Sequence, residues 1–175
     1  MQFHPNTCLT SFLSPLGQMT LAASPTGLNG VWFEGQKHIP PTTQWRTCED
    51  HPILTKAQDL LKTYFSHQWE KGLAARHMLK LMSLDISGGT AFQQAVWQAL
   101  LSIPMGSTCS YGEVAAAIGR PRSVRAVGTA IGQNPLSILI PCHRVLGSQG
   151  QMTGYAGGVW RKQALLELES AEIET

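Results

Sequence analysis

The chain has 175 residues, of which 43% are hydrophobic, and a formal net charge of +2. We expect a soluble globular protein, because this composition supports a packed core and no apolar run approaches the roughly 18 residues of a membrane helix. The four cysteines are widely spaced with no CxxC pair, which excludes a dense disulfide framework and favours free thiols. Prolines interrupt the N-terminal region, unlike a signal peptide, so these features predict a cytoplasmic protein.

The first half of the chain predicts a small unit of strands and one helix. Residues 11–34 contain two extended segments joined by a Pro-Thr-Gly turn, which is typical of an antiparallel hairpin. Apolar residues within the segment 51–68 recur at helical spacing, and residues 79–86 alternate imperfectly, as in another strand. This half contains no concentrated set of chemically suggestive side chains, so we expect it to support the rest of the protein.

A glycine pair marks the expected domain boundary. Gly88 and Gly89 break any regular element, and Thr90 after them can cap a new helix. We therefore predict one domain over residues 1–87 and a second over residues 88–175. The apolar face of the first helix in the second domain contains Phe92, Ala95, Val96, Ala99, Leu100 and Ile103.

The next segment predicts two short helices. Ser110 and Glu113 form a capping box, Gly119 ends the first helix, and a second helix is expected over residues 121–131. A short helix, a glycine-containing turn and an arginine-bearing second helix are typical of a helix-turn-helix, although an ordinary helical hairpin would have the same pattern.

Charge segregation favours a nucleic-acid partner. No acidic residue occurs between Glu113 and Glu167, although accidental segregation on a solvated surface would look the same. The cations in this interval are Arg120, Arg122, Arg125, Arg144, Arg161 and Lys162.

Cys142 follows a short apolar run, "LSILI", which predicts a buried strand that ends at Pro141. A buried cysteine is often only a small hydrophobe, but His143 directly follows this one. A thiol needs a base or a positive field to become a nucleophile at neutral pH, and imidazole is the usual base. Adjacent residues on a strand face opposite ways, so His143 can assist Cys142 only through a turn or a bridging water.

Residue types alone leave three functions open. A cysteine hydrolase would need an orienting group such as Asn134, together with an oxyanion hole. A metal site could be assembled on paper from His4, Cys8, Cys48 and His51. A DNA-binding regulator would use the helix-turn-helix and leave Cys142 without a task.

The segment 134–158, "NPLSILIPCHRVLGSQGQMTGYAGG", resembles the active-site region of the O6-alkylguanine-DNA alkyltransferases, also called methylated-DNA–protein-cysteine methyltransferases. The resemblance covers nearly all of residues 90–169 and is loose before them. It implies an α+β fold, with a ribonuclease-H-like antiparallel N-terminal sheet with helices and a C-terminal winged helix-turn-helix domain that carries the active-site cysteine. It also implies irreversible transfer of an alkyl group from O6 of guanine, and from O4-alkylthymine in some members, onto the protein's own cysteine.

The resemblance assigns catalytic roles to five residues. Cys142 matches the acceptor, and His143 matches the residue that deprotonates it through a water. Glu169 matches the carboxylate that orients the histidine, and Asn134 matches the asparagine that holds the active-site turn. Tyr111 matches the tyrosine that assists departure of the guanine.

Further positions match the guanine pocket. Tyr155 corresponds to its aromatic wall, and Val145 would present a carbonyl to the exocyclic amine. Ala156 stands where many relatives carry serine, and a contact through its backbone N–H would tolerate that change. Ser137 departs from relatives with proline and is expected to widen tolerance for larger alkyl groups.

The resemblance also implies how double-stranded DNA is bound. Arg125 matches an arginine that fills the gap left when the damaged nucleotide is flipped out, and Arg122 adds positive charge beside it. The second helix has small side chains that would allow it to approach the minor groove closely, at Ala126, Gly128 and Thr129. We expect a monomer with no metal and no cofactor. A damage sensor that binds DNA without transfer is the alternative.

Overall fold

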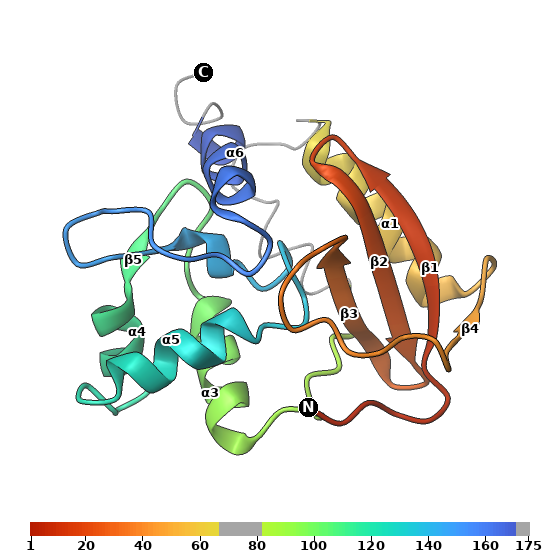
Figure 1. Cartoon of the computed structure of the whole chain (residues 1–175), viewed down its shortest axis with the longest axis horizontal. Helices are drawn as coiled ribbons and strands as arrows, with labels where there is room; N and C mark the ends of the chain where they lie inside the picture. The colour runs from red at the N-terminus through yellow and green to blue at the C-terminus, as the bar shows by residue number, and fades with distance from the viewer. Residues whose placement is uncertain (67–81, 171–175) are drawn as a thin grey trace.

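The computed structural model describes residues 1–66 and 82–170, and it is a mixed α+β protein as expected. One side of the molecule is a four-stranded sheet with a long helix across it, and the other is a group of shorter helices (Figure 1). None of the helices in these two ranges is long and apolar enough to cross a membrane.

The sheet contains β1 (Cys8–Ser14), β2 (Gly17–Ser24), β3 (Gly27–Phe33) and β4 (Arg46–Thr47) in the order β3-β2-β1-β4. The predicted hairpin with its Pro-Thr-Gly turn is β2 and β3. A second turn at residues 14–17, which the prediction missed, adds β1 as an antiparallel neighbour of β2. β4 runs parallel to β1.

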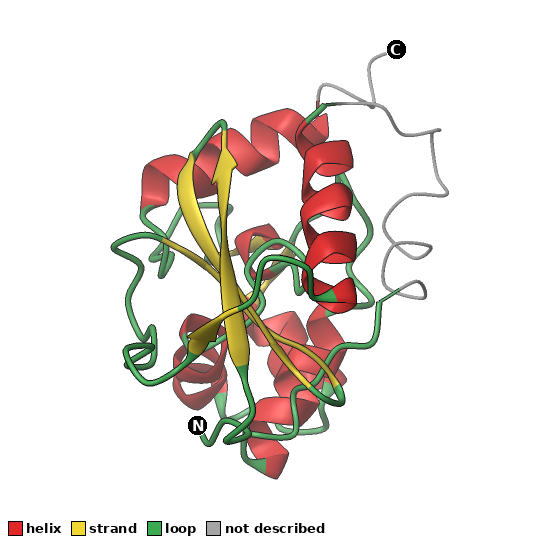
Figure 2. Ribbon diagram, turned by 90° about the vertical axis from the view of Figure 1, so that its right-hand side faces the viewer, coloured by secondary structure: helices red, strands yellow, loops and turns green. Residues whose placement is uncertain are grey.

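Helix α1 (Pro52–Phe65) begins at a proline, as predicted, and lies across the sheet (Figure 2). Its buried side chains are Leu54, Ala57, Leu61 and Tyr64. The strand predicted over residues 79–86 falls partly outside the described residues. Within them, Leu84 forms only an isolated bridge to Leu28 of β3.

In the part of the chain that the structure describes, the other side contains α3 (Ala91–Leu100), α4 (Tyr111–Ala117), α5 (Val124–Gly132) and α6 (Val159–Ser170). Short strands β5 (Cys109–Ser110) and β6 (Val145–Leu146) pair in parallel between them. Both predicted caps are present, because Thr90 and Ser110 accept hydrogen bonds from backbone N–H groups three residues later. Ala95, expected on the buried face of α3, is exposed, and Trp97 is buried in its place.

Helix α5 starts later than predicted. Residues 120–123 form a turn in which the Ser123 N–H donates to the carbonyl of Arg120 at 2.9 Å, with Pro121 as its second residue. Arg122 therefore precedes the helix, whereas Arg125 lies in its first turn. Gly119, with φ +70°, ends α4 as expected, in a conformation that favours glycine.

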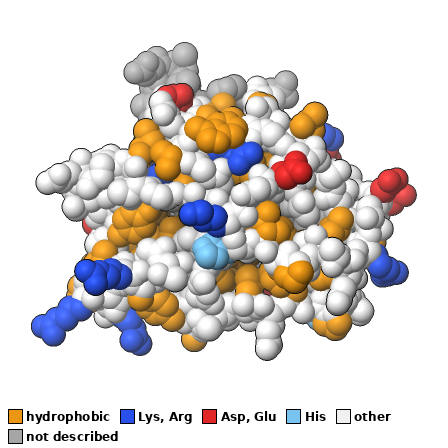
Figure 3. Space-filling view, viewed as in Figure 1, with side chains coloured by type: hydrophobic (Ala, Val, Ile, Leu, Met, Phe, Trp, Pro, Cys, Tyr) orange, Lys and Arg blue, Asp and Glu red, His pale blue; other side chains and the backbone are white. Residues whose placement is uncertain are grey.

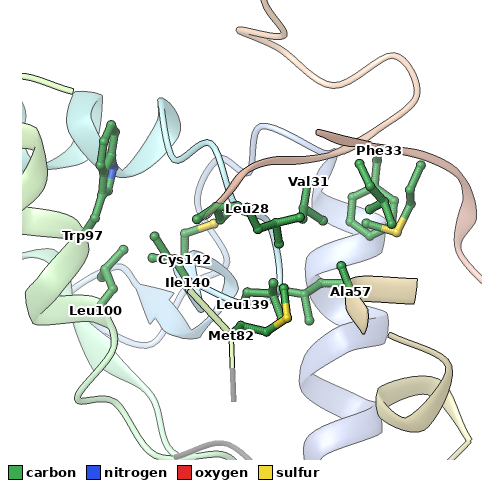
Figure 4. Close-up of a cluster of buried hydrophobic side chains, with 14 of the residues drawn as sticks. Leu28, Val31, Phe33, Ala57, Met82, Trp97, Leu100, Leu139, Ile140 and Cys142 are labelled. Carbon is green, nitrogen blue, oxygen red and sulfur yellow. The ribbon is translucent and has the colours of Figure 1, made fainter. Parts of the chain in front are cut away.

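One hydrophobic cluster joins the two sides of the molecule. Figure 4 shows Cys142 lying between α3 side chains, Trp97 and Leu100, and β3 side chains, Leu28 and Val31. The Trp97 indole N–H donates to the carbonyl of Ala130 on α5 at 2.8 Å, which fixes these two helices together. The division into domains near residue 87 stays a prediction.

Candidate active site

The segment before Cys142 is a buried turn, and the prediction of a strand there was wrong. Only Leu136 pairs, in an isolated bridge with Val31, and Ile138 has φ +73°. Asn134 explains why the chain turns: its Nδ2 donates to the carbonyl of Ile140 at 2.8 Å and its Oδ1 accepts from the Leu136 N–H at 3.0 Å. These bonds satisfy backbone groups that a strand would have paired with a neighbour.

Cys142 begins a three-residue 3₁₀ helix, η1 (Cys142–Arg144). Its Sγ accepts a hydrogen bond from Asn134 Nδ2 at 3.0 Å, and the residue is 6% exposed. Burial raises the pKa of the thiol, whereas the Asn134 hydrogen bond and the positive field of Lys162 oppose that shift. The thiol therefore needs a nearby base to ionise at neutral pH.

His143 contacts Glu169 on α6. The distance from His143 Nε2 to Glu169 Oε1 is 2.8 Å, and both side chains are buried. Hydrogen bonds from His143 and Arg144, together with the charge of Arg144, overcome the effect of burial and lower the pKa of Glu169, so the carboxylate is ionised. An ionised carboxylate only accepts, so Nε2 carries the proton and the buried Nδ1 carries the lone pair.

Arg144 also bonds Glu169, a contact that the sequence did not indicate. Its Nε donates to Glu169 Oε2 and its Nη2 to Oε1, both at 2.8 Å, while Nη1 donates to the carbonyl of Ile103 at 2.6 Å. Burial lowers the pKa of His143 and the Glu169 hydrogen bond opposes that shift, which leaves a neutral imidazole. The η1 turn thus directs two consecutive side chains at one carboxylate. No sequence signal distinguished Arg144 from the surface cations around it.

A pocket of about 190 Å³ opens beside Cys142. Cys142, Tyr111, Gly128, Tyr155 and Ala156 line it. Tyr155, which was predicted to form the aromatic wall, and Gly128 of α5 therefore both line the pocket that contains the thiol.

The N-terminal half also contributes to this pocket, which the sequence did not indicate. Lys37 and His38 lie on its wall, and the Lys37 N–H donates to the carbonyl of Ala156 at 3.0 Å. His38 has φ +65°, an uncommon conformation for a residue with a Cβ. The loop after β3 thus closes one side of the pocket.

Two predicted pocket residues lie outside its lining. Val145 is fully buried, and its carbonyl accepts from Lys162 Nζ on α6. Ser137 is also buried, and its hydroxyl donates to Gln36 Oε1 at 3.0 Å. In this structure, both residues support the segments around the pocket.

The cations of the acid-free interval divide into three groups in the fold. Arg144 and Lys162 are buried and serve the site, and Arg161 is stacked between Phe33 and Trp160. Arg120, Arg122 and Arg125 are exposed around the α4–α5 connection. Basic side chains project from that corner of the molecule in Figure 3. Ala126 and Thr129 are exposed on α5 beside them.

The described residues include no cluster of three or more His, Cys, Asp or Glu side chains that could hold a metal ion. That statement covers His4, Cys8, Cys48 and His51, all of which lie in residues 1–66.

Comparisons with known proteins identify relatives of this chain. Residues 91–171 match the family model described as the DNA-binding domain of 6-O-methylguanine DNA methyltransferase. A methylated-DNA–protein-cysteine methyltransferase of Mycobacterium bovis is 44% identical over 90% of this chain and 89% of the relative, and one of Methanosarcina barkeri is 42% identical over 91% and 95%. A solved structure of Mycobacterium tuberculosis OGT in complex with DNA matches with a TM-score of 0.78 and 43% identity, over 92% of this chain and 91% of that one. This chain therefore belongs to the methylated-DNA–protein-cysteine methyltransferase family.

Proposed function

We propose that this protein repairs DNA by transferring the alkyl group of O6-alkylguanine to Cys142, irreversibly and once per molecule. The observation that carries the assignment is the arrangement around Cys142: its Sγ lies at a pocket and the next residue is a buried neutral histidine held by an ionised carboxylate. This arrangement supports nucleophilic attack by a thiolate.

The chemical step uses a thiolate and a departing base. His143 Nδ1 takes the thiol proton through one water, while Glu169 holds the ring and stabilises the imidazolium. The sulfur then bonds to the alkyl carbon, and the bond from that carbon to O6 breaks. Its electrons return to guanine, and the Tyr111 hydroxyl donates a proton to the departing base and regains one from solvent.

Access to this pocket requires base flipping, because a stacked base cannot reach Cys142. Arg125 at the start of α5 would fill the vacated space, with Arg122 near the backbone, while the small side chains of α5 enter the minor groove. The exposure of both arginines and the position of Gly128 on the pocket wall support this docking. Tyr155 and Ala156 would hold the flipped guanine. The Val145 carbonyl already accepts a hydrogen bond from Lys162, so it would have to accept a second one to bind the exocyclic amine of the guanine.

We further propose that the protein acts as a cytoplasmic monomer without a metal or cofactor. Its four free cysteines support a reducing compartment. The proton relay of Cys142, His143 and Glu169 needs no second subunit, since the described residues of one chain supply all three groups.

The decisive experiment follows a label from DNA to protein. Duplex DNA with a radiolabelled O6-methylguanine should transfer one methyl group per protein, and Cys142→Ala should abolish the transfer. Cys109→Ala is the matched control, because Cys109 is a partly buried free thiol of the same half of the chain that does not line the pocket. Binding without transfer would instead establish the damage sensor, and repeated turnover would exclude the one-use mechanism.

A further inference from the structure

Tyr64 on α1 forms a hydrogen bond with Glu169, the carboxylate that holds His143. The C-terminal ends of α1 and α6 lie at the same end of the molecule (Figures 1 and 2). There the Tyr64 hydroxyl donates to Glu169 Oε1 at 2.9 Å, across 105 residues of sequence. Tyr64 is 2% exposed, so this contact is shielded from water.

The two oxygens of Glu169 accept different numbers of hydrogen bonds. Oε2 accepts from Arg144 Nε, whereas Oε1 accepts from Arg144 Nη2, His143 Nε2 and Tyr64. Arg144 therefore bonds both oxygens of the carboxylate. Tyr64 adds its bond to the same atom that His143 uses.

Sharing one acceptor has a defined electrostatic consequence. Each donor to Oε1 stabilises part of its negative charge, so the Tyr64 bond weakens the attraction between Oε1 and a protonated His143. Burial and the charge of Glu169 raise the pKa of the Tyr64 hydroxyl, which therefore remains a donor at every working pH.

We propose that Tyr64 is a positioning residue of the alkyl transfer, which fixes Glu169 Oε1 and limits the basicity of His143. This role rests on the proposed function of Cys142 as the acceptor. It makes the N-terminal half a contributor to the reaction through α1, where the sequence predicted only support. It also sets the pH below which His143 becomes charged and stops accepting the thiol proton.

Among the described residues, the charged groups that act on His143 come from two elements. Glu169 and Lys162 face it from α6 and Arg144 from η1, while Tyr64 acts from α1 through Glu169. Tyr155 lies within electrostatic range of Tyr64. A change at Tyr64 leaves the other charges in place.

The test is Tyr64→Phe, which keeps the buried ring and removes one hydroxyl. With Oε1 relieved of one donor, the pKa of His143 should rise by about half a unit. Below that pKa the rate of methyl transfer from O6-methylguanine DNA should fall about threefold at a given pH, with the high-pH plateau little changed. NMR titration of the His143 ring should report the same shift without any substrate.

The matched control is Ala57→Gly, on the same buried face of α1 and two turns from Tyr64. It destabilises the helix to an extent similar to the loss of one buried hydrogen bond, and it should leave the His143 midpoint unchanged. Replacing Tyr64 by 3-fluorotyrosine, a stronger donor, should move the midpoint in the opposite direction, which helix damage would not do.

The outcomes separate the two proposals. An unchanged His143 midpoint in Tyr64→Phe, or equal shifts in Tyr64→Phe and Ala57→Gly, overturns the role of Tyr64 even if transfer proceeds normally. Absence of methyl transfer from DNA to the unaltered protein at every pH overturns the proposed function, while the NMR titration still decides whether Tyr64 tunes His143.

Discussion

Two regions of this molecule use arginine in opposite ways. Around Glu169, Arg144 is 4% exposed, and three of its nitrogens have fixed partners. Around the α4–α5 connection, Arg120, Arg122 and Arg125 are exposed. The sequence placed all four in one acid-free interval, so local charge did not distinguish them.

This difference in burial predicts whether a substitution should change stability or the reaction with DNA. A buried ion pair is costly to break, because removing one partner leaves an uncompensated charge in a poorly solvated place. An exposed arginine contributes little to stability, but it adds to the attraction for DNA phosphates and depends on salt. Changes at Glu169 and Arg144 should therefore alter both stability and chemistry, whereas changes to the exposed arginines should alter only reaction with duplex DNA.

The largest effect is expected for Glu169→Gln. Loss of the carboxylate leaves Arg144 buried without a counter-charge and should lower the free energy of unfolding by about 3–5 kcal/mol. The rate of alkyl transfer should fall by about 100-fold or more, because His143 loses the group that holds its proton-accepting tautomer. Glu167→Gln is the control, since Glu167 is exposed on the same helix and bonds only Gln163 among the described residues. Equal effects of the two changes in denaturant titration and transfer assays would contradict the relay.

The same pair of variants tests the acid dependence of stability. The folded pKa of Glu169 lies below its ordinary value of 4.5, so its stabilising contribution is fully present above about pH 4.5. It is lost as the pH falls below that value towards the folded pKa. Thermal melts should therefore show a smaller decrease below pH 4.5 in Glu169→Gln than in Glu167→Gln.

An intermediate effect is expected for Arg125→Ala. Transfer from duplex DNA should slow by about tenfold, because a flipped base then leaves a gap that nothing fills. Reaction with free O6-benzylguanine should stay within about twofold, and stability should not change. Arg46→Ala on β4 is a matched exposed arginine on the other side of the molecule. Equal losses with duplex and free base would show that Arg125 serves the pocket rather than the DNA.

The smallest effect is expected for Gly128→Ala. A Cβ there would lie 3.7 Å from two ring carbons of Tyr111, an ordinary contact on the pocket wall. The helix should gain up to about 1 kcal/mol of stability, while transfer from duplex DNA should slow by about threefold as the approach narrows. Gly112→Ala in α4 is the control, with a Cβ 3.7 Å from Ser110 Oγ and no place on the pocket, so it should only stabilise. Faster transfer in Gly128→Ala would contradict the close approach of α5.

Local sequence patterns predicted the helices well and one buried segment badly. The caps at Thr90 and Ser110 were predictable because a side chain three residues away supplies the second bond. The run "LSILI" has the apolar character of a buried strand, but its backbone bonds go to the Asn134 side chain and to Val31. Periodicity does not distinguish a buried strand from a buried turn, because both require only apolar side chains.

The candidate site shows the same limit. The sequence, through its resemblance to a family, singled out Cys142, His143, Glu169, Asn134 and Tyr111. The structure pairs Asn134 with Cys142 and Glu169 with His143 by hydrogen bonds, and it places Tyr111 on the pocket. Arg144 and Tyr64 were missed because an arginine in a basic interval and a tyrosine on an apolar helix face have ordinary local explanations.

The sequence by itself determined the caps, the breaks between helices, the reactive thiol beside a histidine and the family. Each of these depends on residues a few positions apart or on a long continuous match. Tertiary structure alone decided that Arg144 is buried and Arg125 exposed, that Lys37 and His38 border the pocket, and that Tyr64 bonds Glu169. Burial and hydrogen bonding across 105 residues depend on how α1, η1 and α6 pack together, and no local pattern encodes that packing.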